Sequence, residues 1–530
     1  MRSGLLWVVV GAGSLVASAS GQDRIGLAAL QARLGAATPD GTGVTVMQVE
    51  ADADSAAPRA YLPNSASFPG KVFTDKSGGG VASGHATTVG DFLYGPLSPA
   101  PGVTDIDAYE AVSVNGMSLS LGNWFTTGYL NLGGGSTTPD PLGTESRNVM
   151  CGAFVLQFTT GMTELSDSNA QTLRRLDWSV HNRGMVAVVG IRNDTFDWNP
   201  SGVALGQAYN TITVGSDPQL RQTSRGPTDY AFEQIGRSKP DLVGLSNASS
   251  WSTGSVAGAV ALLRDGAGRL FSGGVLTSAR RPETLKALLL AGCVKNFDTV
   301  TPPPPVYTWT RVTSTVNSVT FREPLDRRTG AGMINVNNSH RILEAGETEA
   351  EVHERTTGWD FHASLAVNSN RTYFFTIPAL HFAEQYTAAL VWHRLVTIGM
   401  AGATAVVPNL NLELHTASGL FLVSKLDESV SPVDNVEYLY ETGLWLTGRY
   451  ALRVVHPAGS PAASGYGLAW DMPVYPMGDV NRSGTVSASD VSSVVGAYGQ
   501  TAPGKKDQDF SNDENVSAWD LAVTLANFAP

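Results

Sequence analysis

The chain has few cysteines, few charged residues and no long apolar run beyond its first residues. Two cysteines, Cys151 and Cys293, exclude a disulfide-dense scaffold and a zinc site of several thiolates; their spacing leaves one bridge or two buried thiols open. Charged residues make up 15% of the chain, against roughly 25% in an average soluble protein. The 35 basic and 47 acidic residues give a net charge of −12. We therefore expect neither nucleic acid nor an anionic membrane as a partner.

Apolar residues and glycine are plentiful instead. The 42% apolar share is enough for large buried cores and excludes a wholly disordered chain, and 57 glycines predict many turns. At the usual size of roughly 100–200 residues per domain, 530 residues accommodate about three or four domains.

The first residues have the composition of an export signal. A positive charge at Arg2 precedes an apolar run over residues 5–16, and small residues at 17–19 follow as a cleavage site. The run is shorter than the ~20 apolar residues that a membrane span needs. We predict that residues 1–21 are a signal peptide and that the protein is secreted, without a membrane anchor.

Residues 22–348 alternate apolar, strand-like runs with helical stretches, which predicts an α/β domain with a parallel sheet. A helix is expected at about 168–182, and strands are expected at 44–49, 112–121, 185–189 and 211–214. In such sheets reactive groups gather at the carboxyl ends of the strands.

Three segments carry candidate reactive groups, in the order acid, histidine, serine. The first strand ends at Glu50, with Asp52 two residues further on; His85 lies among small residues; Ser250 lies before an apolar helix. A serine hydroxyl becomes a strong nucleophile when an imidazole takes its proton and a carboxylate orients that imidazole. Neighbouring serines at 249 and 252 are the alternatives to Ser250.

The surroundings of these residues resemble the subtilisin-like serine peptidases (subtilases). Six segments carry the resemblance, in family order: 41–50, 85–89, 186–193 with 209–215, 239–243, 248–258 and 330–335. The resemblance implies a three-layer fold and peptide-bond hydrolysis without a cofactor. It also implies catalytic roles for Glu50, His85 and Ser250, and an oxyanion-binding amide from Asn193.

The sequence departs from the family pattern at several positions. The family has aspartate where this chain has Glu50, and Asp52 would share its strand face and is the alternative acid. Ala86 and Ala248 replace family glycines, and Gly254 replaces a proline. These departures leave open a catalytically inactive relative that serves as a scaffold or binding protein. The sedolisins, with Glu, Asp and Ser, fit less well because they leave the histidine unexplained.

Residues 349–475 change to short strands with period-two apolar placement, which predicts a β-sandwich. Strands are expected at 372–377, 388–392, 410–414 and 449–454. The segment resembles the jelly-roll module appended to many subtilases. Trp392 and Trp445 would be carbohydrate contacts if exposed, and packing in the core is the other interpretation.

The last fifty residues contain two loops with the oxygen spacing of calcium-binding loops, each followed by a short apolar helix. The side chains at the ligand positions are Asp479, Asn481, Ser483, Thr485 and Asp490 in the first loop, and Asp509, Ser511, Asp513 and Asp520 in the second. Position six is Gly484 in the first loop and Glu514 in the second, where glycine is normally required, so the second site is expected to be weaker.

This duplicated arrangement over 477–530 resembles a dockerin domain, a small all-α calcium-loop module. The resemblance implies structural calcium and a cohesin-type partner module that tethers the protein to an extracellular, polysaccharide-associated assembly. The whole chain is thus predicted to be a secreted serine endopeptidase acting on polypeptides.

Overall fold

The computed structural model describes residues 25–52, 59–115, 118–121, 147–152, 167–191, 205–216, 236–295, 308–352, 354–399, 402–461, 465–501, 507–511 and 513–529. The predicted signal peptide and Asn193 lie outside these residues. Within them, no helix combines the length and the apolar character needed to cross a membrane.

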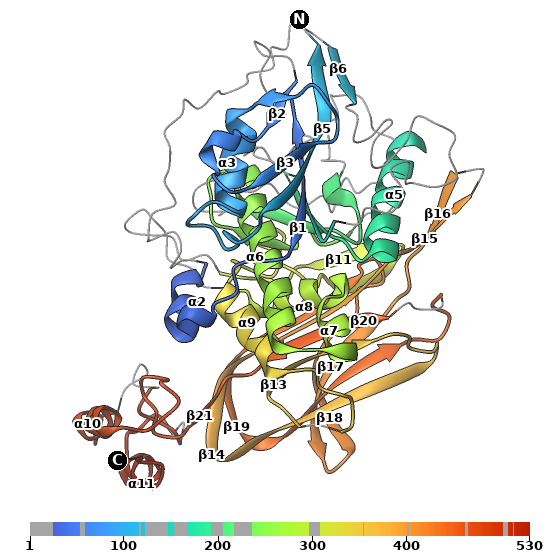
Figure 1. Ribbon diagram of the computed structural model, residues 1–530. Helices are drawn as coiled ribbons and strands as arrows, with labels where there is room; N and C mark the ends of the chain where they lie inside the picture. The colour runs from blue at the N-terminus through green and yellow to red at the C-terminus, as the bar shows by residue number, and fades with distance from the viewer. Residues whose placement is uncertain are drawn as a thin grey trace, which may run out of the picture.

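The part of the chain before residue 349, here called the parallel-sheet domain, is built on one eight-stranded sheet (Figure 1). Its strand order is β10-β9-β8-β7-β1-β5-β3, all neighbours are parallel, and β6 adds to β5 as an antiparallel strand. The strands are β1 (Thr45–Ala51), β3 (Val72–Asp75), β5 (Asp105–Asn115), β6 (Ser118–Leu121), β7 (Val149–Gly152), β8 (Val186–Gly190), β9 (Ile212–Ser216) and β10 (Leu242–Gly244).

Helices cover both faces of this sheet, because buried apolar side chains of β1 point to opposite faces. Val46 faces α3 (Gly84–Leu93) and α6 (Ser249–Leu270), whereas Met47 and Val49 face α5 (Asp167–Arg183). The result is the expected three-layer α/β arrangement. The domain also contains α2 (Leu27–Leu34), α7 (Gly273–Ala279), α8 (Pro282–Gly292), α9 (Val336–Ala345) and the short pairs β2 (Ala60–Leu62) with β4 (Val81–Ala82) and β11 (Thr313–Val316) with β12 (Val319–Arg322).

The sequence prediction differs from the structure in the strands. The expected strand at 112–121 is the end of β5 and all of β6, joined as a hairpin. Strands β3, β7 and β10 are absent from the prediction. Each has only three or four residues, which is too short for periodicity to reveal.

The following antiparallel domain contains one seven-stranded sheet with the order β13-β20-β14-β19-β17-β18, and β21 pairs with β14. Two strands predicted at 372–377 and 388–392 are halves of a single strand, β14, whose register shifts between them. Side chains of both halves enter the same buried cluster, so the bent sheet encloses its own core. The strands are β13 (Thr357–His362), β14 (Ser369–Trp392), β17 (Asn411–Ser418), β18 (Phe421–Ser429), β19 (Val436–His456), β20 (Tyr466–Asp471) and β21 (Val474–Pro476), with a separate hairpin of β15 (Leu395–Gly399) and β16 (Gly402–Val406).

The two domains pack together through one hydrophobic core. Ala389, Val391 and Tyr438 of the antiparallel sheet belong to the same buried cluster as α6 and α8 of the parallel-sheet domain. The β15–β16 hairpin lies against α5 (Figure 1), where Ala403 N donates to Gln171 Oε1 at 2.6 Å. Trp392 is fully buried and donates from Nε1 to Pro408 O at 2.8 Å, so it is a core residue.

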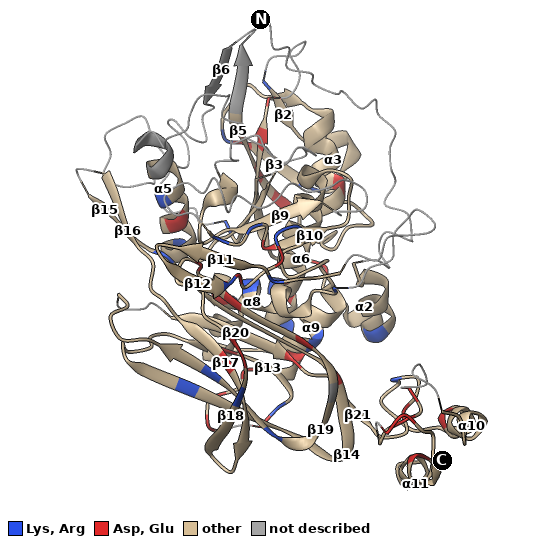
Figure 2. Cartoon of the chain, turned by 180° about the vertical axis from the view of Figure 1, so that it is seen from behind, with Lys and Arg blue, Asp and Glu red and all other residues tan. Residues whose placement is uncertain are grey.

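The C-terminal module contains α10 (Ala488–Ala497) and α11 (Ala518–Ala526), each preceded by a loop rich in aspartate (Figure 2). It contacts the antiparallel domain through Phe382, whose ring lies 5.7 Å from that of Phe510. Arg482 Nε also donates to Glu384 Oε2 at 2.9 Å. The module is therefore seated on the bend of β14.

Candidate active site

The acid of the predicted triad lies at the carboxyl end of β1. Strand alternation turns Glu50 toward the α3 and α6 side of the sheet, where it is buried. Its Oε1 accepts a hydrogen bond from Gln48 Nε2 (2.8 Å), and its Oε2 lies 2.9 Å from His85 Nδ1. A carboxylate only accepts, so the imidazole donates from Nδ1 and Glu50 sets its orientation and tautomer.

Asp52, the alternative acid, has other partners. Its carboxylate accepts hydrogen bonds from the backbone N–H groups of Arg59 (2.8 Å) and Ala60 (3.1 Å). These bonds hold the chain where it returns into β2. The structure thus brings Glu50, and not Asp52, to His85.

His85 is in the first turn of α3, which the side chain of Ser83 caps by accepting from Ala86 N at 3.3 Å. Burial of the ring disfavours its protonation. The charge of Glu50 and the hydrogen bond to it outweigh burial, and the pKa of His85 is raised above its ordinary value. With Nδ1 on Glu50, Nε2 is the ring nitrogen left for proton transfer.

Ser250 is buried in the first turn of α6. The N-cap residue, Ala248, has no side-chain acceptor, so the first turn of this helix lacks side-chain capping. The positive end of the helix dipole favours negative charge at this place.

The packing of α3 on α6 sets the relation between His85 and Ser250. A methyl carbon on Gly254 would lie 2.8 Å from Val89 O, and one on Gly258 would lie 2.7 Å from Leu93 O. The two helices therefore run side by side in the same direction. His85 precedes Val89 by four residues, and Ser250 precedes Gly254 by four residues. Both residues therefore lie one helical turn earlier on the contacting faces of α3 and α6. Both residues are described, and no hydrogen bond joins them; such bonds are often long without substrate.

The close approach of the two helices predicts the effect of adding a side chain at Gly258. Gly258→Ala places a methyl group against a backbone carbonyl that cannot move aside, and we expect a loss of about 1–3 kcal/mol in the free energy of unfolding. Gly274→Ala in α7 is the matched control, since a methyl group there meets nothing within 4 Å and should change the free energy of unfolding by no more than about 0.5 kcal/mol. Denaturant unfolding of both variants measures the difference; equal effects would contradict the close packing.

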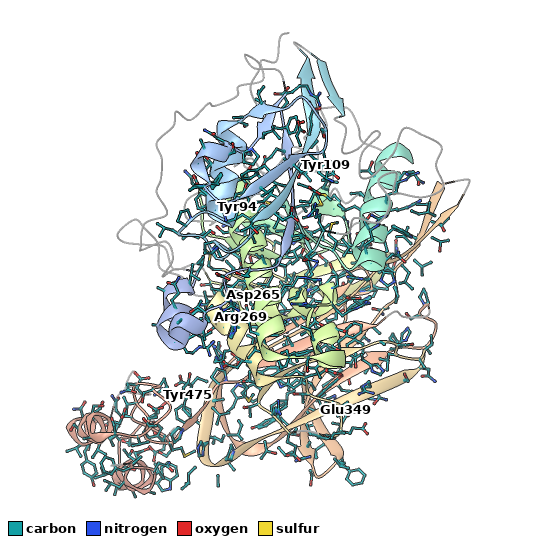
Figure 3. All side chains as sticks on the ribbon, viewed as in Figure 1. Tyr94, Tyr109, Asp265, Arg269, Glu349 and Tyr475 are labelled. Atoms are coloured by element: carbon teal, nitrogen blue, oxygen red, sulfur yellow. The ribbon has the colours of Figure 1, made fainter. Side chains whose placement is uncertain are left out.

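Two residues behind the acid were missed by the sequence analysis. Gln48 Nε2 also donates to Ala86 O (2.9 Å), and Tyr94 Oη donates to Gln48 Oε1 (2.7 Å). Tyr94, labelled in Figure 3, packs on Phe68 and is buried. The chain Tyr94–Gln48–Glu50–His85 fixes the carboxylate from behind. Its signal in the sequence is a glutamine at a core-facing position of β1.

Both cysteines are buried free thiols, so the structure has no bridge between Cys151 and Cys293. Burial raises the pKa of the Cys151 thiol well above its usual value, and the charge of Glu50 adds to the effect. Cys151 pairs with Gln48 across β1 and β7 and is thus part of the wall behind the acid.

The two predicted calcium loops have matching hydrogen bonds. In the first, Asp479 accepts from Ser483 N (3.0 Å) and Gly484 N (2.7 Å), and Asp490 accepts from Val480 N (3.0 Å). In the second, thirty residues later, Asp509 accepts from Asp513 N and Glu514 N, and Asp520 accepts from Phe510 N.

Position six is left-handed in both loops, with φ 90° at Gly484 and φ 68° at Glu514. The side chain at Glu514 makes this conformation costly. The ligand positions offer oxygen atoms only, which suits a hard cation such as calcium.

No sequence-family profile and no curated protein matches the chain. Among solved structures, it is similar to a serine protease of Aeromonas sobria, at 13% identity over 82% of this chain and 89% of that one, with a TM-score of 0.34. The serine protease MycP1, a component of a type VII secretion system, matches at 12% identity over 60% of this chain and 87% of that one, with a TM-score of 0.27. Tripeptidyl peptidase 2 matches at 11% identity over 73% of this chain and 40% of that one, with a TM-score of 0.30.

Proposed function

We propose that the chain is a secreted serine endopeptidase of the subtilisin-like kind. The observation that carries the proposal is the 2.9 Å contact between Glu50 and His85 at the carboxyl end of a parallel strand, on the side where the first turn of α6 holds Ser250. The acid comes from β1 of the sheet, and the base and the hydroxyl come from α3 and α6, which pack on one face of that sheet.

The chemistry follows from these positions. His85 takes the proton of Ser250 Oγ, the oxygen attacks the peptide carbonyl carbon, and the imidazolium is stabilised by Glu50. The tetrahedral oxyanion is bound by the N–H of Ser250 and by the amide of Asn193. His85 then protonates the leaving amine, and water, deprotonated by the same ring, hydrolyses the acyl-enzyme.

A fluorophosphonate probe, which phosphonylates activated serines, tests the proposal. We expect the wild-type chain to be labelled and to cleave casein, and Ser250→Ala to lose both activities while its circular dichroism is unchanged. Ser249→Ala and Ser252→Ala are the matched controls and should keep them. Loss in a control alone would move the nucleophile to that residue.

The other function to be weighed is an inactive scaffold. The absence of a hydrogen bond between His85 and Ser250 is the observation in its favour. Folded wild-type protein that is neither labelled nor proteolytically active would establish this alternative and refute the peptidase.

The C-terminal module is proposed to bind structural calcium and to dock, like a dockerin, on a cohesin-type partner. Calcium would supply charge neutralisation to the aspartates of each loop. It would be held in the first loop by Asp479, Asn481, Ser483, Thr485 and Asp490, and in the second by Asp509, Ser511, Asp513 and Asp520. The paired hydrogen-bond patterns and the left-handed residue at position six support two equivalent loops.

A further inference from the structure

Two histidines and a glutamate from three separate elements meet at the junction of the two large domains. His181 lies in the last turn of α5, Glu283 in the first turn of α8, and His393 directly follows β14. One potential ligand atom from each lies within 4.8 Å of the other two. Because α5 covers the sheet face opposite to α3 and α6, this cluster is separate from the Glu50–His85 pair.

Two of the three distances between the ligand atoms match those of a metal site. His181 Nδ1 lies 3.1 Å from His393 Nδ1, and His393 Nδ1 lies 3.1 Å from Glu283 Oε1. Two nitrogens bound to one tetrahedral zinc ion at 2.0–2.1 Å are separated by about 3.3 Å. One ion therefore fits between the three groups after small side-chain adjustments.

Glu283 is the independent indication that something is bound. Its side chain is fully buried, and among the residues that the structure describes no group meets hydrogen-bond geometry with either carboxylate oxygen, although His393 Nδ1 lies 3.1 Å from Oε1. Arg281 Nη2 lies 3.6 Å from Oε1 and forms an ion pair with Glu283, at a distance too long for a hydrogen bond. A buried carboxylate without hydrogen bonds carries a large desolvation cost, which a directly coordinated cation removes.

The hydrogen atoms of the two imidazole rings cannot satisfy every polar contact in this cluster. His393 Nδ1 faces both His181 Nδ1 and Glu283 Oε1, but it carries either one hydrogen or one lone pair, so it satisfies one of the two contacts at most.

The segment that carries His393 is fixed into the parallel-sheet domain. Arg394 N donates to Asn210 Oδ1 at 2.8 Å, and Arg394 Nε donates to the buried Asp177 Oδ2 at 2.7 Å. Asp177 is one turn before His181 on α5. The ligands are thus held by buried polar bonds on both sides of the domain junction.

We propose that His181, Glu283 and His393 bind one zinc ion, with water as fourth ligand, and that this ion cross-links the parallel-sheet domain to the antiparallel domain. Two imidazoles and a carboxylate in tetrahedral geometry suit zinc. The role is structural, because the ligands come from three elements that pack against one another, and the bound ion would hold them together.

The experiment uses the full chain with calcium in excess, so that the C-terminal loops do not take up the added metal. After equilibrium dialysis against zinc, we expect about one zinc per chain by elemental analysis. Removing a ligand should weaken zinc binding by on the order of 100-fold or more, since changes even outside the ligand sphere cost roughly 10–100-fold. His181→Ala and Glu283→Gln should therefore lose the zinc.

The matched controls are His415→Ala and Glu413→Gln, because His415 Nε2 and Glu413 Oε2 form a comparable pair at 3.0 Å without a second histidine. They should retain the zinc. In place of zinc, cobalt(II) should give the intense visible absorption of a tetrahedral site in wild type and in the controls only. Zinc should raise the melting temperature of wild type but not of Glu283→Gln, a change that keeps the side-chain volume. Wild-type protein without stoichiometric zinc, or ligand variants that bind as wild type does, would overturn the proposal.

Discussion

Glu50→Gln is expected to lower kcat of the proposed peptidase by on the order of 10⁴-fold, the cost of the equivalent aspartate-to-asparagine change in a serine protease triad. The glutamine keeps the hydrogen bond from Gln48 but turns an amide N–H toward His85 Nδ1. The ring then accepts at Nδ1 and carries its proton on Nε2, where it cannot take the proton of Ser250. Hydrolysis of a peptide ester and of casein measures the loss.

Asp52→Asn is the matched control for this substitution. Asp52 bonds two backbone N–H groups and not the imidazole, so the variant should lose stability and keep most of its kcat. A variant at Asp52 as inactive as Glu50→Gln would identify Asp52 as the acid. An unchanged kcat in Glu50→Gln would refute the assignment of Glu50.

Glu50→Gln should also change the pH dependence of activity, and the direction of the change follows from the pKa of His85. Glu50 raises that pKa, and the ring must be neutral to act as base, so activity falls as pH drops through the raised value. Without the carboxylate charge the pKa falls, and ring protonation moves to lower pH. NMR titration of His85 in Ser250→Ala, with and without Glu50→Gln, measures the shift without self-digestion.

The strand alternation of β1 explains why part of the site was predictable. The sequence shows a buried strand that ends in an acid, a histidine among small residues and a serine before an apolar helix. This pattern indicates which groups lie at one edge of the sheet. The choice between Glu50 and Asp52 was not predictable, because both fall on the same face at period two. The choice is decided by the backbone N–H groups of Arg59 and Ala60, which donate to Asp52 and so hold its carboxylate away from the histidine. This contact depends on the path of the chain after β1, which the residue pattern does not report.

Long-range contacts also explain the other differences. The predicted strands at 372–377 and 388–392 are one strand because β14 bends while keeping β19 as its partner through shifts of register. Gly254, a departure from the family pattern, lies where Val89 O leaves no room for a side chain. The meeting of His181, Glu283 and His393 depends on docking of two domains, which no local pattern reports.

The largest effect of metal removal is expected in the C-terminal module. In the full chain, chelation of calcium should speed amide hydrogen exchange in α10 and α11, because the buried Asp479 and Asp490 then lose the cation that offsets their charge. At free calcium a thousandfold above Kd, binding adds about 4 kcal/mol, which corresponds to about a thousandfold slower exchange through local opening. Exchange measured by mass spectrometry, with α3 and α6 as internal references, tests this.

Asp513→Ala separates calcium binding from the stability of the module itself. Asp513 is exposed, and from the described residues its carboxylate accepts a hydrogen bond from Asn515 N alone, so the metal-free module should be little changed. Its protection by calcium should be reduced in α11 more than in α10. Asp507→Ala, an exposed acid outside the ligand positions, is the matched control and should keep the full protection. If chelation leaves exchange unchanged in wild type, or if both variants respond alike, the aspartates stabilise the loops through backbone hydrogen bonds alone and the calcium assignment is wrong.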